Sequence, residues 1–124
     1  MLDRSFFARY YETYASEDAA ALGAFYADDV TLTSSQGVIR GKEALLDTYR
    51  YITSLFHDKM TPDAIFIDGD RAAIEITDRF EAKSDVENFL GRSFAKGDAF
   101  TMKICGVYRV EGGKIRQVTI YSGA

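Results

Sequence analysis

Apolar residues recur with two different periods along the chain, and the change of period divides it in two. Up to about residue 58 they lie three or four positions apart, whereas from about Met60 onward they mostly alternate with polar residues. The first spacing is typical of amphipathic helices and the second of half-buried strands. We therefore predict an α+β fold in which helices cover the apolar side of an antiparallel sheet.

Three helices are predicted in the first half of the chain. The first covers roughly residues 3–15, and its face carries four aromatic residues at helical spacing, Phe7, Tyr10, Tyr11 and Tyr14. The second covers residues 18–27, with Ser16 or Asp18 as the capping residue. The third covers residues 42–56. Short amphipathic helices of this kind need a partner surface to be stable.

The partner surface is predicted in the second half as two hairpins. Residues 63–82 form the first, with its turn at Asp68, Gly69 and Asp70, because an aspartate–glycine pair accommodates the positive φ of a tight turn. Residues 99–122 form the second. Residues 28–41 are predicted as two short strands, and residues 83–98 either as a flexible loop or as an extension of the flanking strands.

One carboxylate interrupts the apolar face of the first hairpin. In the strand "AAIEITDRFEA" that face is made by Ile74, Ile76 and Phe80. Asp78 lies on the same face, although a buried, unpaired charge costs several kcal/mol or shifts its pKa. Asp78 is therefore either an acid in a pocket or the partner of an arginine such as Arg50 or Arg92. A strand register shifted by one residue would instead turn it to solvent.

Composition and charge narrow the class of protein. The 124 residues suit one domain, residues 1–124, and the chain is 47% apolar and 14% aromatic with no apolar run near the ~20 residues of a membrane span. The net charge of −4 and the lack of a basic cluster argue against nucleic acid as a partner. A single cysteine, Cys105, and an opening segment unlike a signal peptide favour a cytoplasmic location.

Metal and cofactor sites are not predicted. The chain has one histidine, His57, and one cysteine, and neither lies in a cluster with ligand spacing. His57 is predicted at the end of the third helix, where the helix dipole favours a cation, although its near-neutral pKa also suits catalysis. The glycines gather in turns and form no phosphate-binding loop.

Three short passages carry a family resemblance: "FYADDV", "GKEAL" and "YRVEGGKI". With them, nearly the whole chain resembles the nuclear transport factor 2-like superfamily. Within it the chain is similar to the SnoaL-like group, which has ketosteroid isomerase, limonene epoxide hydrolase and polyketide cyclase relatives. The resemblance implies three helices packed on a strongly curved mixed or antiparallel sheet, a cone with an apolar pocket. It also implies a homodimer through the outer sheet face, which would use Cys105, Val107, Gln117, Thr119 and Tyr121.

The resemblance to ketosteroid isomerase extends to one of its three catalytic positions. Tyr10 falls where the isomerase has the tyrosine of its oxyanion hole; as an alternative it is a core tyrosine with a bonded hydroxyl. Ser34 falls at the general base, and serine at that point also suits a turn. Gly106 falls at the second oxyanion donor. Isomerisation by that mechanism is therefore not expected, because no base is present.

The resemblance to the epoxide hydrolases also keeps one position of three. Their Asp–Arg–Asp cluster activates water and protonates the epoxide oxygen. Asp78 falls on one aspartate, Ile76 on the arginine, and Ile120 near the other aspartate. A pocket acid is also what SnoaL-type cyclases rely on, so Asp78 is the acid that all these comparisons leave in place.

The predicted function is that of a small-molecule enzyme, an isomerase, cyclase or hydratase, with Asp78 as general acid or base and Tyr10 as oxyanion donor. The substrate is expected to be apolar and could be polycyclic. Further predicted substrate-binding residues are Tyr14, Phe25, Ser34, Tyr49, Phe56, Ile76, Phe80, Phe100, Met102 and Ile104. The alternative is a non-catalytic module for ligand binding or dimerisation. Residues 83–98 are a candidate lid over the pocket, and neither nucleic acid nor membrane is expected as a partner.

Overall fold

The computed structural model describes residues 2–122, and it confirms the predicted α+β class. The elements in chain order are α1 (Arg4–Ala15), α2 (Ala19–Gly23), β1 (Tyr26–Ser34), β2 (Gly37–Arg40), α3 (Lys42–Leu55), β3 (Phe56–Asp68), β4 (Arg71–Ala82), β5 (Val86–Phe89), β6 (Arg92–Phe94), β7 (Ala99–Glu111) and β8 (Lys114–Ser122). No helix among residues 2–122 combines the length and the apolar character that crossing a bilayer requires.

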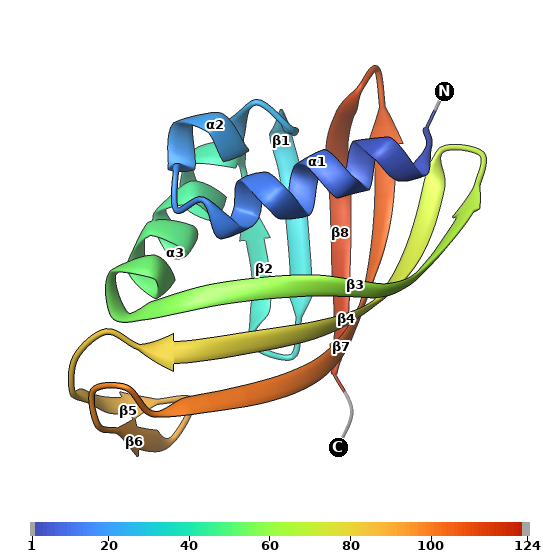
Figure 1. The fold of residues 1–124 in the computed structure, drawn as a ribbon. Helices are drawn as coiled ribbons and strands as arrows, with labels where there is room; N and C mark the ends of the chain where they lie inside the picture. The colour runs from blue at the N-terminus through green and yellow to red at the C-terminus, as the bar shows by residue number, and fades with distance from the viewer. Residues whose placement is uncertain (1, 123–124) are drawn as a thin grey trace.

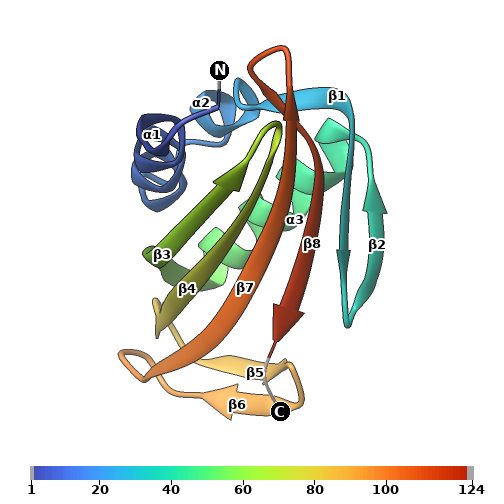
Figure 2. The same cartoon turned by 90° about the vertical axis from the view of Figure 1, so that its right-hand side faces the viewer.

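The main sheet has six strands in the order β2-β1-β8-β7-β4-β3, and it is mixed. Strands β1 and β8 run parallel, whereas the other neighbours run antiparallel. Strands β3, β4 and β7 are long and strongly bent, and α1 runs alongside β3 and passes in front of β1 and β8 in this view (Figure 1). The turned view places α3 behind the curved sheet (Figure 2). The helices thus lie on the concave side, as the resemblance implied.

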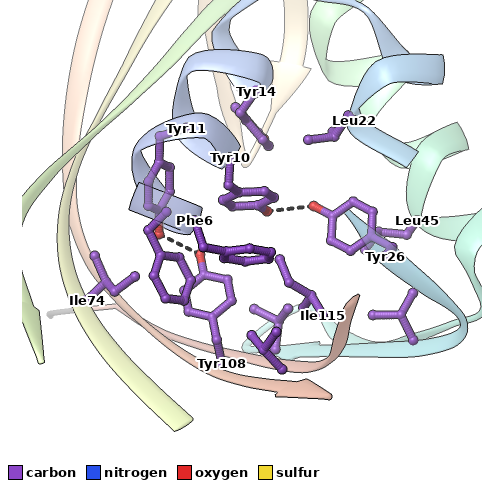
Figure 3. Packing of buried hydrophobic residues seen from close by; sticks show 14 of the residues in the cluster. Phe6, Tyr10, Tyr11, Tyr14, Leu22, Tyr26, Leu45, Ile74, Tyr108 and Ile115 are labelled. Atoms are coloured by element: carbon purple, nitrogen blue, oxygen red, sulfur yellow. Dashed lines mark hydrogen bonds between the residues drawn. The ribbon is translucent and has the colours of Figure 1, made fainter. Parts of the chain in front are cut away.

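Helix α1 is stabilised by a capping residue at its start and by the burial of its aromatic face. The Asp3 side chain accepts a hydrogen bond from the backbone N–H of Phe6 and so satisfies one free donor of the first turn. The predicted aromatic face is buried, with Phe7, Tyr10, Tyr11 and Tyr14 between 0% and 9% exposed. Figure 3 shows the rings of Tyr10 and Tyr11 beneath the helix, close to those of Tyr26 and Tyr108. The tyrosine hydroxyls can therefore form hydrogen bonds only with one another and with other buried groups.

Helix α2 is shorter than predicted. Asp18 is its cap, because its side chain accepts from the N–H of Ala21, and the helix ends at Gly23. The chain then enters the sheet: the N–H of Ile115 donates to the carbonyl of Phe25, and Tyr26 pairs with Ile115. Sheet hydrogen bonds from the far end of the sequence thus override the helical spacing of residues 25–27.

Strand β3 begins much earlier than predicted, directly after α3. It starts at Phe56 rather than at residue 63, and a bulge follows Pro62. His57 is therefore a strand residue and not the end of a helix; its Nδ1 lies 2.8 Å from the Glu17 carboxylate. The residues between Phe56 and Pro62 alternate inward and outward, which places Asp58 on the concave face.

Residues 83–98 are an ordered hairpin, formed by β5 and β6, rather than a loop without structure. The hairpin covers a second apolar core whose buried members are Phe56, Phe80, Ala82, Val86 and Phe94. The Arg92 guanidinium lies 5.2 Å from the ring centre of Phe94 and 5.6 Å from that of Phe100. The hairpin lies at the far end of the long strands β4 and β7 (Figure 1).

Candidate functional site

A cavity of about 290 Å³ lies between the concave face of the sheet and helices α1 and α3. Its walls are mostly apolar and aromatic. Ser35 and Gln36 at the β1–β2 turn and Leu90 at the β5–β6 turn line it as well, and all three are exposed. The cavity therefore reaches the surface between the tips of these two hairpins. Eight of the predicted site residues line it: Tyr10, Tyr14, Ser34, Tyr49, Asp78, Phe80, Met102 and Ile104.

Four predicted pocket residues lie elsewhere. Phe56 and Phe100 belong to the second core under the β5–β6 hairpin, because β3 begins at Phe56 and carries its ring toward β5 and β6. Ile76 is buried in the main core without lining the cavity. Phe25 does not line the cavity; its ring packs edge-on against those of Phe6 and Tyr10. These positions correct the predicted pocket lining.

Two carboxyl groups lie side by side in the cavity wall. Asp58 of β3 and Asp78 of β4 are each only 4% exposed. Asp58 pairs across the ladder with Phe80 and Asp78 with Met60, so the two acids are diagonal neighbours on one face of the sheet. The hydroxyl of Tyr14 donates to Asp58 Oδ2 over 3.0 Å. Among residues 2–122, no N–H or O–H group of a third residue donates to Oδ1 of Asp58 or to Oδ1 of Asp78. We call Asp58 and Asp78 the acid pair.

Both members of the acid pair have raised pKa values. Burial, together with the hydrogen bond to Asp58 and its negative charge, raises the pKa of Asp78 to about 10. Burial also raises the pKa of Asp58, whereas hydrogen bonds from Asp78 and Tyr14 oppose that rise. At neutral pH Asp78 is therefore protonated, and Asp58, the more acidic member, lies beside it. One neutral acid and one carboxylate in contact are the two groups that acid–base catalysis needs.

The arginines considered as partners of Asp78 are engaged elsewhere. Arg50 forms a salt bridge with Asp47 over 2.9 Å, and Arg92 lies over two phenyl rings. Strand β4 also has the predicted register, since Asp78 is buried rather than turned to solvent. Of the three interpretations of Asp78, the structure agrees with an acid that faces a pocket.

Tyr10 lies in the cavity wall, but its hydroxyl is bonded to another tyrosine. The hydroxyls of Tyr10 and Tyr26 lie 2.6 Å apart, and that of Tyr11 donates to Tyr108 over 2.8 Å (Figure 3). Burial raises the pKa of Tyr10 to about 12, so the phenol stays neutral. The tyrosine that reaches the acid pair is Tyr14, one turn further along α1.

A comparison of the sequence with models of protein families gives a match. The model of the SnoaL-like domain matches residues 7–118, which is most of the chain. This chain belongs to the SnoaL-like family. No curated protein matches it.

Solved structures share the SnoaL-like fold at low sequence identity. A putative polyketide cyclase from Xanthomonas campestris pv. campestris superposes with a TM-score of 0.82 at 21% identity, over 96% of this chain and 88% of that one. An LEH-like epoxide hydrolase from M. tuberculosis gives 0.77 at 18%, over 96% and 80%. A hypothetical protein with a ketosteroid isomerase-like fold from Catenulispora acidiphila, in complex with trimethylamine, gives a TM-score of 0.79 at 16% identity, over 98% of this chain and 88% of that one. At these identities the likeness establishes the fold.

The SnoaL-like cavity departs from the isomerase pattern at the positions inferred from the sequence. Ser34 is both a turn residue and part of the cavity rim, because its hydroxyl accepts from the N–H of Gln36. At Gly106 a Cβ atom would lie 2.7 Å from Cε1 of Tyr108, so the tyrosine ring occupies the space of a second acid. Ile120, at the epoxide-hydrolase aspartate position, is an apolar wall residue.

Asp58 is the site residue that the sequence analysis missed. The segment "FHDKM" already alternates, with Phe56, Asp58 and Met60 on one face. The helical spacing of Ile52 and Phe56 extended the predicted helix over the start of this alternation. A second aspartate on the same period as Phe56 and Met60 was the signal available. Within residues 2–122 no three histidine, cysteine or acidic side chains come together in a way that would hold a metal ion.

Proposed function

We propose that this SnoaL-like protein is an acid–base enzyme for a small, mostly apolar molecule with one reactive oxygen, an epoxide or a carbonyl. Asp78 is the general acid and Asp58 the general base. The proposal rests on one observation: two buried carboxyl groups lie side by side in the wall of an apolar cavity. Structural carboxylates are usually paired with cations or solvent, and these are not.

The acid pair can complete a catalytic cycle without a further group. In epoxide hydration, the Asp78 proton passes to the epoxide oxygen as the C–O bond breaks. Water forms a new bond to the carbon and loses a proton to Asp58, which yields a diol. The proton then returns from Asp58 to Asp78 through their hydrogen bond. In an isomerisation Asp78 gives its proton to the carbonyl oxygen while Asp58 removes a proton from carbon, which yields an enol. Asp58 then returns its proton to another carbon of the enol, and the enol O–H proton goes back to Asp78.

The cavity limits the size of the substrate. A volume of about 290 Å³ is at the lower end of ligand pockets and equals roughly ten water molecules at ~30 Å³ each. A ligand of about ten non-hydrogen atoms fits this volume, so we propose a monocyclic substrate in place of the polycyclic one considered from sequence.

Tyr14 is a positioning residue in this scheme. Its hydroxyl donates to Asp58 and thereby holds that carboxylate beside Asp78. Tyr10 contributes a wall whose hydroxyl is already bonded to Tyr26. A direct oxyanion role for Tyr10 would require that bond to break, and we therefore assign the chemistry to the acid pair.

The test is turnover of monocyclic epoxides and cyclic unsaturated ketones by the wild type and by Asp78→Asn and Asp58→Asn. Each variant is expected to lower kcat by about 10²- to 10⁴-fold, the range typical of a lost acid or base. Asp63→Asn is the matched control, because Asp63 lies on the same strand as Asp58 but is exposed and bonds to Thr77.

Ligand binding is measured beside turnover. Full activity of Asp78→Asn refutes the assignment of the general acid. Binding of panel members by a wild type that turns none of them over supports the alternative function, a ligand-binding module without catalysis.

A further inference from the structure

The two carboxyl groups of the acid pair lie in the cavity wall without a cationic side chain of the described residues beside them, so an ionised Asp58 has no counter-charge there. Among residues 2–122, neither Asp58 nor Asp78 lies within salt-bridge distance of a lysine, arginine or histidine. None of the described residues that line the cavity is a lysine, arginine or histidine either. A buried charge without a counter-charge is costly. A bound cation is what would relieve that cost.

The groups that face the acid pair do not supply positive charge. Tyr14 and Tyr10 approach from α1, Tyr49 from α3 and Tyr26 from β1. Burial raises the pKa of each of these four phenols, so all of them stay neutral. They add hydroxyl dipoles but no counter-charge for Asp58.

The remaining walls suit a cation rather than an anion. Aromatic rings of Tyr10, Tyr14, Tyr49, Phe80 and Tyr108 line the cavity. The faces of such rings are electronegative and attract ammonium groups, an interaction worth up to about 2 kcal/mol when water is excluded. An enolate or another oxyanion in the same space would instead be repelled by the Asp58 carboxylate.

We propose that the cavity selects a small organic cation, a positive charge carried on an apolar ring of about the substrate's size. The inference rests on the proposed function only in taking this cavity as the ligand site. It deepens that function, because acid-initiated opening of an epoxide develops positive charge on carbon, which the carboxylate and the rings would stabilise. Ammonium compounds are therefore expected to act as mimics of the reacting state.

Three ligands of the same shape and the same number of non-hydrogen atoms test the inference by calorimetry at pH 7. N,N-dimethylcyclohexylammonium carries a positive charge, acetylcyclohexane none, and cyclohexanecarboxylate a negative one. The ammonium is expected to bind at least about tenfold more tightly than the ketone, and the carboxylate more weakly than the ketone. Equal binding of all three, or preference for the carboxylate, overturns the proposal.

Two variants locate the source of the selectivity. Asp58→Asn removes the charge and keeps the shape and the aromatic rings, so the advantage of the ammonium over the ketone is expected to shrink while the ketone still binds. Asp63→Asn is expected to keep the wild-type preference. An ammonium advantage in Asp58→Asn as large as in the wild type overturns the assignment to the acid pair.

Turnover assays separate this inference from the proposed function. A wild type that prefers the ammonium but converts no substrate sustains the inference and removes the enzyme. A wild type that converts neutral substrates without preferring the ammonium does the reverse.

Discussion

Because the pKa of Asp78 is raised in the folded protein, we predict that the protein becomes less stable as the pH rises from 5 to 8. In the folded protein the pKa of Asp78 is raised to about 10. In the unfolded chain an aspartate has a pKa of about 3.9. Between these values the folded state binds more protons than the unfolded state, so the free energy of unfolding falls with increasing pH. Asp78 makes its full contribution to the stability below about pH 4.

The size of the effect follows from the slope. One group that is protonated only in the folded state contributes up to about 1.4 kcal/mol per pH unit, or about 4 kcal/mol between pH 5 and 8. This is a large part of the 5–15 kcal/mol typical of a domain. The lowered pKa values of Glu17 and Asp63 act below this window, because their contribution is lost only as the pH falls toward 4 and beneath it.

Urea unfolding followed by circular dichroism at pH 5, 6, 7 and 8 measures this dependence. Asp78→Asn imitates the protonated acid and titrates no longer, so its free energy of unfolding should decline much less over the same range. Other titrating groups contribute equally to the wild type and to Asp78→Asn, so their effects cancel when the two free energies of unfolding are subtracted. Asp63→Asn, whose carboxyl is exposed, should retain the wild-type slope.

A wild-type stability that stays constant or rises from pH 5 to 8 would refute the reasoning. So would an Asp78→Asn profile parallel to that of the wild type, because the proton would then belong to another group.

Three further predictions concern the surroundings of the cavity. Tyr14→Phe removes the hydrogen bond to Asp58 and should cost about 2 kcal/mol in urea unfolding; an unchanged stability would contradict the bond. Gly106→Asp should destabilise the protein by about 1–3 kcal/mol, because its Cβ would lie 2.7 Å from the Tyr108 ring. If the substitution leaves the stability unchanged, the ring moves freely. The outer sheet face, where Tyr121 is 59% exposed, is expected to form a homodimer. Light scattering that finds a monomer at micromolar concentration would contradict it, and Tyr121→Lys should dissociate the dimer.

Local patterns predicted the elements well where neighbours in sequence decide the structure. The aromatic face of α1, the extent of α3 to within one residue, and the two hairpins with their glycine turns follow from spacing and turn chemistry. The predictions failed where distant residues decide. Residues 25–27 left the predicted helix because Ile115 pairs with Tyr26, and Phe56 left α3 because β4 offers it a strand partner.

The sequence alone determined that a carboxylate lies on the apolar face of β4, since a period of two places Asp78 with Ile74 and Phe80 whatever the strand packs against. Only the tertiary structure decided what Asp78 meets there. Its neighbour Asp58 is twenty residues away, and the register of β3 against β4 brings the two acids together. A lone buried acid and an acid pair differ in charge and in proton affinity, and that difference depends on a contact between strands that no single segment contains.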